Sequence, residues 1–542
     1  MLTLLAFLLL VQTAPLPSPG KDRPAAAPQP VDELGLGETV RRLIEGAGLA
    51  EAVWTVVVRD VRSDSVLLRM NPHVIKPASN LKLLSSAAFL HLMGPEFRYV
   101  TGVWLRGTPN GEVWEGDVVV VGSGDPTLGA PWLDTPPLDV FERVADSLRA
   151  RGITRIEGDL IGVESLFDAQ PYPAGWSWDD ITFYYAVQNG PLSFHENTVG
   201  LTVHADTPVG SSPRVEWFPY STDYVSFENR QRVTPSDQPY EEGYLRLPGT
   251  NVVQLTSSLP RGKVEEEAIA VHDPGGYFMD TLHKTLLRGS IQVAGQVRTT
   301  RDTTFVRDSL GLDLAAPWDA DTAVPTHELP PPVRLASYQS PDLSVLLREM
   351  NQESSNFISE MLAKTAAAMR TGHSGSTEEG VFVIREQLAD LGIDTSRVEL
   401  QDASGMSPGN RLSADELNRL LVRMTRHPHA QVYRQSLAVA GRSGTLERRL
   451  TQPGRFCPGG SEPPVDALPP DTPAVYERPC LDRPGAFAGK SGYISGVRTL
   501  SGYLSTASGR EVAVTLATNQ FIGKVSKVDR VQEAILTLLH EN

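Results

Sequence analysis

The feature that most constrains the fold is a change in the sequence pattern about one hundred residues into the chain. Up to about residue 95 the sequence reads as a helix, two strands and a second helix, and helical periodicity returns after a Pro-rich connector at 323–333. Between residues 99 and 301, strand-like runs alternate with Gly, Pro and Asp, and one clear helix at 138–152 interrupts them. The pattern predicts a helix-containing domain interrupted by a β-rich insertion.

Length and charge narrow the class of protein further. At 542 residues the chain exceeds what one hydrophobic core supports, so two or three domains are expected. A composition of 40% hydrophobic and 21% charged residues is typical of a globular protein. The net charge of −16, without any basic block, argues against a nucleic-acid partner.

The N-terminus has the pattern of an export signal. The apolar run from Leu2 to Val11 is too short to span a bilayer and suits the core of a signal peptide, with a buried strand or helix as the alternative. We expect residues 1–14 to be a signal peptide and residues 15–31 to be a disordered linker. No later run is long enough to cross a membrane. We therefore expect a periplasmic or cell-envelope protein with peripheral or no membrane association.

The chain has two cysteines, Cys457 and Cys480, in a segment rich in Pro and Gly. In an exported protein they can form a disulfide, which would stabilise the fold by about 3 kcal/mol. Two free cysteines or a redox pair are the alternatives. Their spacing fits neither C-x-x-C nor a zinc knuckle.

Three short motifs follow one another along the chain, each in a suitable local context. Ser79 and Lys82 form an S-x-x-K at the start of an apolar helix that covers 76–92. Residues 354–356, Ser-Ser-Asn, are the only S-x-N and lie in a helix-rich segment. Residues 490–492, Lys-Ser-Gly, are the only K-[ST]-G and lie at the start of a strand. Further along the helical part, Ser413 and Glu416 have the spacing of a capping box.

These residue types suit nucleophilic catalysis. A serine hydroxyl needs a neighbouring base, and a lysine can be that base only as a free amine. Lys82 follows Ser79 by one turn on the same helix face, where burial and a second cation, Lys490, would lower its pKa. Ser354 and Asn356 would complete a proton relay and hold the substrate amide. Each motif also has a plain structural reading, such as a lysine reaching solvent.

The three motifs in this order resemble those of the class C low-molecular-mass penicillin-binding proteins, the D-alanyl-D-alanine carboxypeptidase/endopeptidases of the peptidase S13 type. The resemblance runs from about residue 31 to 520 and includes the segments 116–128, 400–408 and 436–450. The long gap between Ser79 and Ser354 also matches, because this family carries two small inserted domains there. Serine β-lactamases keep these two motifs much closer.

The resemblance implies an α/β (α+β) penicillin-binding, β-lactamase-like transpeptidase fold. An antiparallel sheet flanked by helices would carry two inserted, smaller β-rich domains. The catalytic domain would be discontinuous, formed by residues 32–95 and 333–542, and the inserted region would cover 96–332. The segment 451–485 looks longer than the family needs.

The resemblance also implies roles for the motif residues. Ser79 would be the acylated nucleophile and Lys82 its general base, with Ser354 passing a proton to the leaving amine and Asn356 completing the second motif. The middle residue of that motif is Ser355, where Asp is frequent.

The third motif would bind the substrate's terminal carboxylate. Lys490 and Ser491 make this contact in the Lys-Ser-Gly motif that Gly492 completes, where Lys-Thr-Gly is usual. The backbone N–H groups of Ser79 and Tyr493 would form the oxyanion hole. A further family signature contains Asp402, Ser404 and Gly405, without an assigned role. No metal or cofactor is implied.

The implied activity is that of a serine-type D-Ala-D-Ala carboxypeptidase that is also an endopeptidase. Its partners would be peptidoglycan stem peptides ending in D-Ala-D-Ala, and β-lactam antibiotics as inhibitors. One alternative is a serine β-lactamase or SxxK esterase, which would turn penicillin over rapidly. Another is a non-catalytic cell-wall scaffold.

Overall fold

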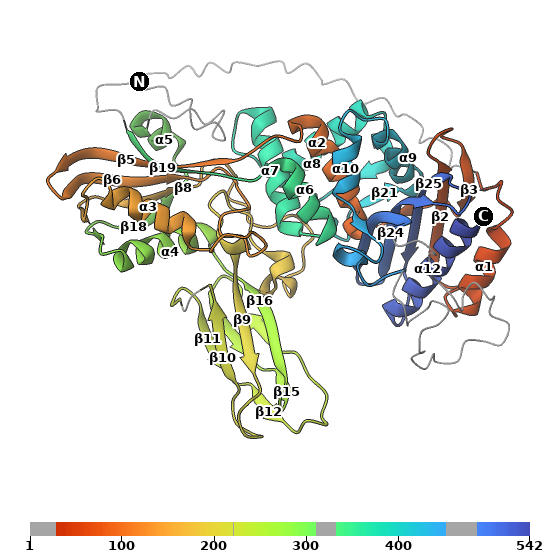
Figure 1. The fold of residues 1–542 in the computed structure, drawn as a ribbon, viewed down its shortest axis with the longest axis horizontal. Coiled ribbons are helices and arrows are strands. Elements are labelled where there is room, and N and C mark those ends of the chain that lie inside the picture. The colour runs from red at the N-terminus through yellow and green to blue at the C-terminus, as the bar shows by residue number, and fades with distance from the viewer. Residues whose placement is uncertain (1–28, 220–221, 311–331, 451–484) are drawn as a thin grey trace, which may run out of the picture.

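The computed structural model describes residues 29–219, 222–310, 332–450 and 485–542. The predicted signal peptide, most of the predicted linker and both cysteines, Cys457 and Cys480, lie outside the described residues. Figure 1 shows an elongated molecule with a helix-covered sheet at each end and a narrow projection of strands that leaves the long axis. The first and last described parts of the chain lie together at one end.

One antiparallel sheet joins both ends of the chain. Its strand order is β1-β3-β2-β25-β24-β23-β22, so strands from the first 70 residues pair with strands from the last 105. Successive side chains of a strand point to opposite faces. Val56, Val57 and Val58 are nonetheless all fully buried, because helices cover both faces. The strands are β1 (Val31–Asp32), β2 (Val53–Asp60), β3 (Val66–Met70), β22 (Ala438–Val439), β23 (Phe487–Ile494), β24 (Val497–Ser505) and β25 (Glu511–Asn519).

Two helical layers sandwich this sheet. Helices α1 (Gly37–Gly46) and α12 (Val525–Glu541) pack on one face, and α2 (Leu81–Met93) and α9 (Ala414–Met424) lie on the other (Figure 1). This arrangement confirms the predicted antiparallel sheet flanked by helices. The second layer continues with α6 (Leu343–Gln352), α7 (Asn356–Thr371), α8 (Thr377–Asp390), α10 (Ala430–Gln435) and a small sheet of β20 (Val398–Glu399), β21 (Arg411–Ser413) and β4 (Val74–Ile75).

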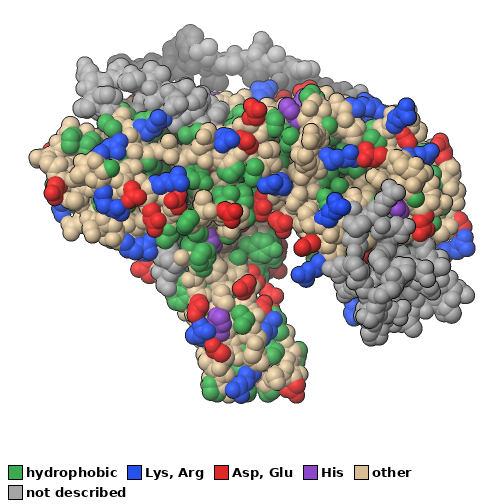
Figure 2. Space-filling model, in the orientation of Figure 1, with side chains coloured by type: hydrophobic (Ala, Val, Ile, Leu, Met, Phe, Trp, Pro, Cys, Tyr) green, Lys and Arg blue, Asp and Glu red, His purple; other side chains and the backbone are tan. Residues whose placement is uncertain are grey.

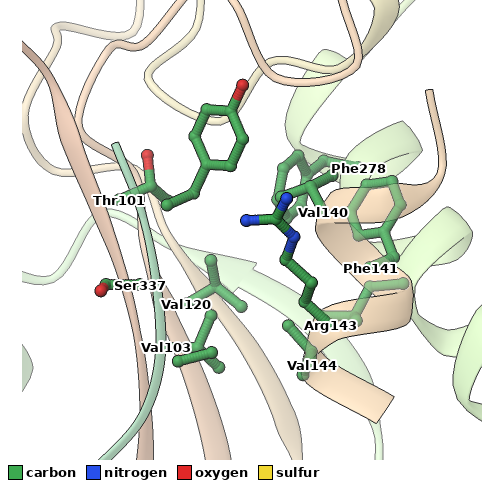
Figure 3. Close-up of a pocket in the computed structure, with 12 residues that line it drawn as sticks. Thr101, Val103, Val120, Val140, Phe141, Arg143, Val144, Phe278 and Ser337 are labelled. Atoms are coloured by element: carbon green, nitrogen blue, oxygen red, sulfur yellow. The ribbon is translucent and has the colours of Figure 1, made fainter. Parts of the chain in front are cut away.

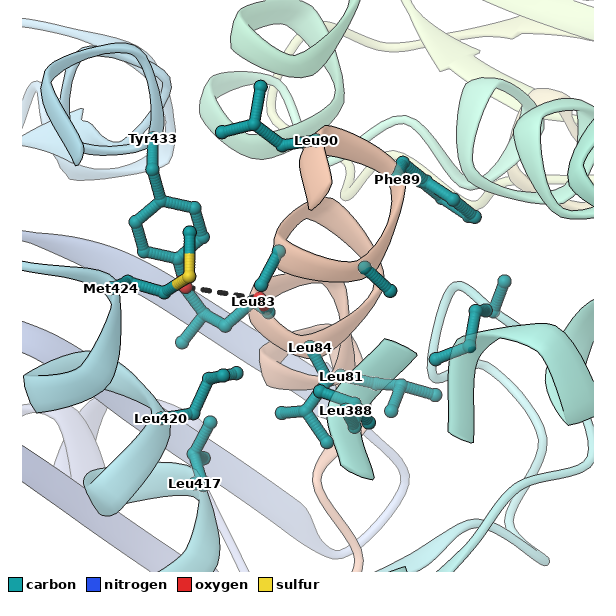
Figure 4. Close-up of a cluster of buried hydrophobic side chains, with 14 of the residues drawn as sticks. Leu81, Leu83, Leu84, Phe89, Leu90, Leu388, Leu417, Leu420, Met424 and Tyr433 are labelled. Atoms are coloured by element: carbon teal, nitrogen blue, oxygen red, sulfur yellow. Dashed lines mark hydrogen bonds between the residues drawn. The ribbon is translucent and has the colours of Figure 1, made fainter. Parts of the chain in front are cut away.

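Helix α2 lies at the centre of the second layer. Every residue from Leu81 to Leu90 is buried, as expected for a helix that is apolar on all sides. Figure 4 shows its leucines pointing toward Leu417 and Leu420 of α9 on one side and Leu388 of α8 on the other. A polar side chain on this helix therefore has to find its partners within the protein.

The predicted capping box at the start of α9 is wrong. Ser413 is the last residue of β21, and its side chain makes no capping hydrogen bond. Glu416 Oε2 instead accepts a hydrogen bond from the Asp394 N–H at 3.0 Å. The sequence has the spacing of a capping box, but the Glu416 carboxylate binds the Asp394 backbone and not the start of α9.

A second sheet forms the other end of the molecule. Helices α3 (Asp139–Arg149) and α4 (Pro274–Arg288) pack on one face, and α5 (Thr303–Leu310) packs on the other. Strand β19 brings the chain back toward α6. The strands are β5 (Val100–Asn110), β6 (Val113–Val121), β7 (Arg155–Ile156), β8 (Leu160–Val163), β17 (Gln292–Val293), β18 (Val297–Thr300) and β19 (Val333–Gln339).

The projection consists of smaller sheets, with the orders β10-β9-β16, β11-β14-β13 and β12-β15. The β-rich character predicted for this part of the chain is observed, while the exact domain boundaries stay a prediction. The strands are β9 (Thr198–His204), β10 (Arg214–Phe218), β11 (Ser226–Asn229), β12 (Arg232–Thr234), β13 (Tyr244–Arg246), β14 (Val252–Leu255), β15 (Ser258–Pro260) and β16 (Val264–Ala270).

A small cavity lies between the second sheet and α3. Figure 3 shows Val103 and Val120 of the sheet facing Phe141 and Val144 of the helix across it. Its volume of about 20 Å³ has room for about one water molecule, which is too little for a substrate.

Charges of both signs are interspersed over the face that Figure 2 displays. Among the described residues, no helix is both long and apolar enough to cross a membrane.

Candidate active site

Ser79 lies in a single 3-10 turn, Ala78–Asn80, immediately before α2. Ala78 has a φ of +47°, a conformation that costs a non-glycine residue free energy. Asn80 Nδ2 donates a hydrogen bond to the Lys490 carbonyl at 2.7 Å, and Thr499 Oγ1 donates one to the Pro77 carbonyl at 2.8 Å. Strands β23 and β24 therefore hold the turn that carries Ser79.

Gly492 is the point where β23 passes close to this turn. A Cβ at this position would lie 2.9 Å from the Ser79 amide nitrogen and 2.3 Å from Thr499 Oγ1. Neither distance leaves room for a side chain. The glycine of the third motif thus allows the strand to approach the serine of the first.

Lys82 is fully buried, and its ammonium has three uncharged acceptors. Nζ lies 3.2 Å from Ser79 Oγ, 2.6 Å from Asn356 Oδ1 and 2.9 Å from the carbonyl oxygen of Ser404. Burial lowers the pKa of Lys82 to about 7, although the charges of Asp402 and Glu360 act in the opposite direction. Near neutral pH a large fraction of Lys82 is therefore a free amine beside the Ser79 hydroxyl.

The second motif lies at a break between α6 and α7. Ser354 has a φ of +66°, and the Ser355 hydroxyl accepts a hydrogen bond from the Ile358 N–H at 3.2 Å, which caps α7. Asn356 is the first residue of α7, and its side-chain amide bridges two regions. Its Oδ1 accepts from Lys82, and its Nδ2 donates to the Tyr185 carbonyl at 2.8 Å.

Lys490 and Ser491 of the third motif lie on β23, beside the second motif. Lys490 Nζ donates to Ser354 Oγ at 2.8 Å and to the Ser491 carbonyl at 3.0 Å. Ser491 Oγ donates to Thr445 Oγ1 at 3.0 Å. Burial, together with the charge of Lys82, lowers the pKa of Lys490 well below its usual value. The structure thus brings all three motifs into one hydrogen-bonded cluster.

Three groups of this cluster were missed or left without a role by sequence reasoning. The Ser404 carbonyl accepts a hydrogen bond from Lys82. Two buried carboxylates, in turn, hold the backbone of the loop that carries Ser404. Glu360 accepts hydrogen bonds from the N–H groups of Ala403 and Ser404, and Asp402 accepts one from Gly405. Burial and the neighbouring Asp402 charge raise the pKa of Glu360. The available signal was the charged residue Glu360, four positions after Asn356 and within a helix whose neighbouring residues are mostly apolar.

A cavity of about 1220 Å³ opens over the serines of the first two motifs. Ser79, Ser354, Asn356 and Tyr493 line its floor, and the Tyr493 side chain is half exposed. Aromatic and acidic residues form its walls: Trp176, Trp178, Tyr184, Tyr185, Phe357, Asp179, Asp180, Glu196, Glu349 and Glu353. Burial raises the pKa of both Glu196 and Glu349 to about 7.

The model of the D-Ala-D-Ala carboxypeptidase 3 (S13) family matches residues 36–308 and 318–460, more than three quarters of the chain. The chain belongs to this family. The resemblance predicted from the three motifs is confirmed, and with it the class of enzyme, a serine-type D-Ala-D-Ala carboxypeptidase. The matched residues include the first two motifs of this S13 peptidase, and Lys490 follows them in the chain.

Two relatives cover most of this S13 peptidase. A D-alanyl-D-alanine carboxypeptidase of Actinomadura sp. is 29% identical over 93% of this chain and 84% of that protein. The D-alanyl-D-alanine carboxypeptidase DacB of Haemophilus influenzae is 20% identical over 92% of this chain and 89% of its own length.

Solved structures confirm the predicted fold class. The crystal structure of penicillin binding protein 4 (dacB) from Haemophilus influenzae aligns with a TM-score of 0.73 at 19% identity, and the alignment covers 93% of this chain and 99% of that one. A second structure of that protein, in complex with a β-lactam, aligns with a TM-score of 0.68 at 18% identity over the same shares of both chains.

Proposed function

We propose that this S13 peptidase removes the terminal D-alanine of peptidoglycan stem peptides through an acyl-enzyme on Ser79. The observation that carries the proposal is the position of Lys82. Its buried Nζ lies 3.2 Å from Ser79 Oγ and contacts uncharged acceptors, so it is a base that can exist unprotonated at neutral pH.

In the proposed acylation, neutral Lys82 takes the proton of Ser79 Oγ as this oxygen attacks the carbonyl of the penultimate D-alanine. The oxyanion that forms accepts hydrogen bonds from the backbone N–H groups of Ser79 and Tyr493. When the C–N bond breaks, the leaving D-alanine nitrogen receives a proton from Ser354 Oγ, and this oxygen recovers a proton from Lys490 Nζ, which donates to it at 2.8 Å. Water then hydrolyses the ester and regenerates Ser79.

Substrate recognition is proposed to use the third motif and the cavity wall. Lys490 and Ser491 would bind the carboxylate of the terminal D-alanine. A volume of about 1220 Å³ exceeds what two alanines fill, which favours a longer peptide and an additional endopeptidase activity on cross-links. The carboxylates of the wall, among them Asp179 and Glu353, favour an amino-bearing peptide.

We propose that β-lactams acylate the same serine, since they present a carboxylate and a reactive carbonyl to the same groups. The β-lactam complex of the structurally similar Haemophilus influenzae protein supports this proposal. Export to the periplasm or cell envelope is proposed from the apolar run at residues 2–11.

The test of the proposed activity is release of free D-alanine from a stem peptide that ends in D-Ala-D-Ala. The purified protein should release one D-alanine per peptide, measured with D-amino-acid oxidase. The matched control is the same peptide ending in D-Ala-L-Ala, which should lose little of its terminal alanine; peptide mass spectrometry follows this loss, because the oxidase does not detect L-alanine. A protein that releases no D-alanine but rapidly destroys benzylpenicillin would contradict the proposal and favour a β-lactamase.

The rate of Ser79 acylation should rise with pH through about 7. Lys82 has its pKa lowered from its usual value near 10.5 to about 7, so the reactive free amine is scarce below pH 7 and predominates above it. The second-order rate constant for acylation by benzylpenicillin should rise about tenfold per pH unit on the acid side and level off above pH 8 or so. A midpoint near pH 10 would contradict the lowered pKa of Lys82, and a rate that does not change with pH would mean that Lys82 is not the base.

A further inference from the structure

One wall of the cavity is built by a single loop, residues 171–189, between β8 and β9. It supplies most of the aromatic side chains and two of the acidic ones: Trp176, Trp178, Asp179, Asp180, Tyr184 and Tyr185. Its regular structure is limited to two short 3-10 turns, Asp180–Thr182 and Tyr184–Ala186, and an isolated β-bridge between Phe183 and Ile269. Its conformation therefore depends on the contacts at its two ends and on those along its inner edge, the side that faces the catalytic groups.

The two ends of the loop meet. The Asn189 N–H donates a hydrogen bond to the Pro171 carbonyl at 2.9 Å. At this closure lies the ammonium of Lys364, whose side chain is 1% exposed. Its Nζ donates to the Gln170 carbonyl at 2.7 Å, to the Asn189 carbonyl at 3.5 Å and to Asp168 Oδ1 at 2.8 Å.

Lys364 belongs to the catalytic part of the chain. It lies on α7 eight residues after Asn356, and positions four and eight apart share one face of a helix. At the start of this face Asn356 Nδ2 donates to the Tyr185 carbonyl, and beside it Trp176 Nε1 donates to Asp402 Oδ2 at 3.0 Å. The loop is thus tied to the catalytic groups at its inner edge and to Lys364 at its base.

The alternative role for Lys364 is a purely structural one, in which it only joins two regions of the protein. Burying an ammonium costs free energy, and a single ion pair with Asp168 would be enough to join the two regions. The other two hydrogen bonds of Lys364, however, go to the backbone on either side of the loop. This distribution suits a residue that fixes the width and direction of the loop.

We infer that Lys364 is a specificity-positioning residue, which holds both ends of the 171–189 loop so that its aromatic and acidic side chains face the peptide part of the substrate. The inference rests on the proposed peptidase function. Lys364 does not itself line the cavity. A small β-lactam that needs Ser79, Ser354 and Lys490 does not need this wall, whereas a stem peptide does.

The test compares two reactions of the same variant. In Lys364→Met, kcat/KM for a stem peptide ending in D-Ala-D-Ala should fall at least about tenfold, mainly through a higher KM. The rate constant for acylation by benzylpenicillin should stay within about twofold of the wild type. The matched control is Lys284→Met on α4, which removes a lysine paired with Asp280 at 2.8 Å and should change neither reaction.

Asp168→Asn is a milder second variant, because it keeps the ammonium and its two carbonyl partners. It should shift the peptide reaction in the same direction but less, and it keeps the inference testable where Lys364→Met folds poorly. An equal loss in both reactions, or no loss in either, would overturn the inference. Failure of the proposed function looks different, since the wild type itself would then release no D-alanine.

Discussion

Replacing Ser79 with alanine should abolish the covalent adduct that the wild-type protein forms with benzylpenicillin. Ser79 Oγ is the hydroxyl within 3.2 Å of the Lys82 amine, and alanine offers no atom to attack the β-lactam carbonyl. Intact-protein mass spectrometry after brief exposure should show one added penicilloyl group on the wild type and none on the variant. The release of D-alanine should fall by about 10⁴-fold or more.

The matched control is Ser86→Ala. Ser86 lies on α2 two turns after Ser79, and its hydroxyl donates to the Leu83 carbonyl at 3.3 Å and also contacts Tyr433. This variant should form the adduct at the wild-type rate. An adduct that persists on Ser79→Ala would place the nucleophile elsewhere. Rapid loss of the drug without any wild-type adduct would favour the β-lactamase alternative.

The meeting of the three motifs could be predicted from sequence because each constrains its surroundings. Lys82 lies on a helix that is apolar on all sides, so its amine must be paired inside the protein. Gly492 marks a strand that passes close to another backbone, and the observed neighbour is Ser79. In both cases the residue type is unusual for its element: Lys82 is a lysine in an apolar helix, and Gly492 is a glycine inside a strand.

The remaining parts of the site depend on tertiary contacts that leave little trace in local sequence. The break before α7 follows an apparently continuous helical pattern, and only the Ser-Ser-Asn at 354–356 hints at a cap. The Ser404 carbonyl is a backbone group that any residue could supply, and it comes from a segment 322 positions away from Lys82. The 171–189 loop shows aromatic and acidic residues but no period that would place it over Ser79.

Replacing Lys82 with methionine should remove acylation while preserving the fold. Methionine matches the length and the apolar surroundings of the lysine, and it has no proton acceptor for the Ser79 hydroxyl. The rate of benzylpenicillin acylation should fall by about 10²- to 10⁴-fold, the usual contribution of a general base. The rise of the rate through pH 7 should disappear with it, because the group that titrates there is gone.

Two further measurements distinguish a base at position 82 from a buried positive charge there: the melting temperature of Lys82→Met and the activity of Lys82→Arg. Burial lowers the pKa of Lys82, which means that a charged Lys82 destabilises the folded state. Lys82→Met removes this charge, so the variant should melt at the wild-type temperature or above it. Lys82→Arg keeps a positive charge but cannot give up its proton at any accessible pH. If Lys82 acts as the base, the arginine variant is as inactive as the methionine variant, as measured by adduct formation over time. If Lys82→Arg keeps most of the acylation rate, the amine serves only to hold Asn356 and the Ser404 carbonyl in place.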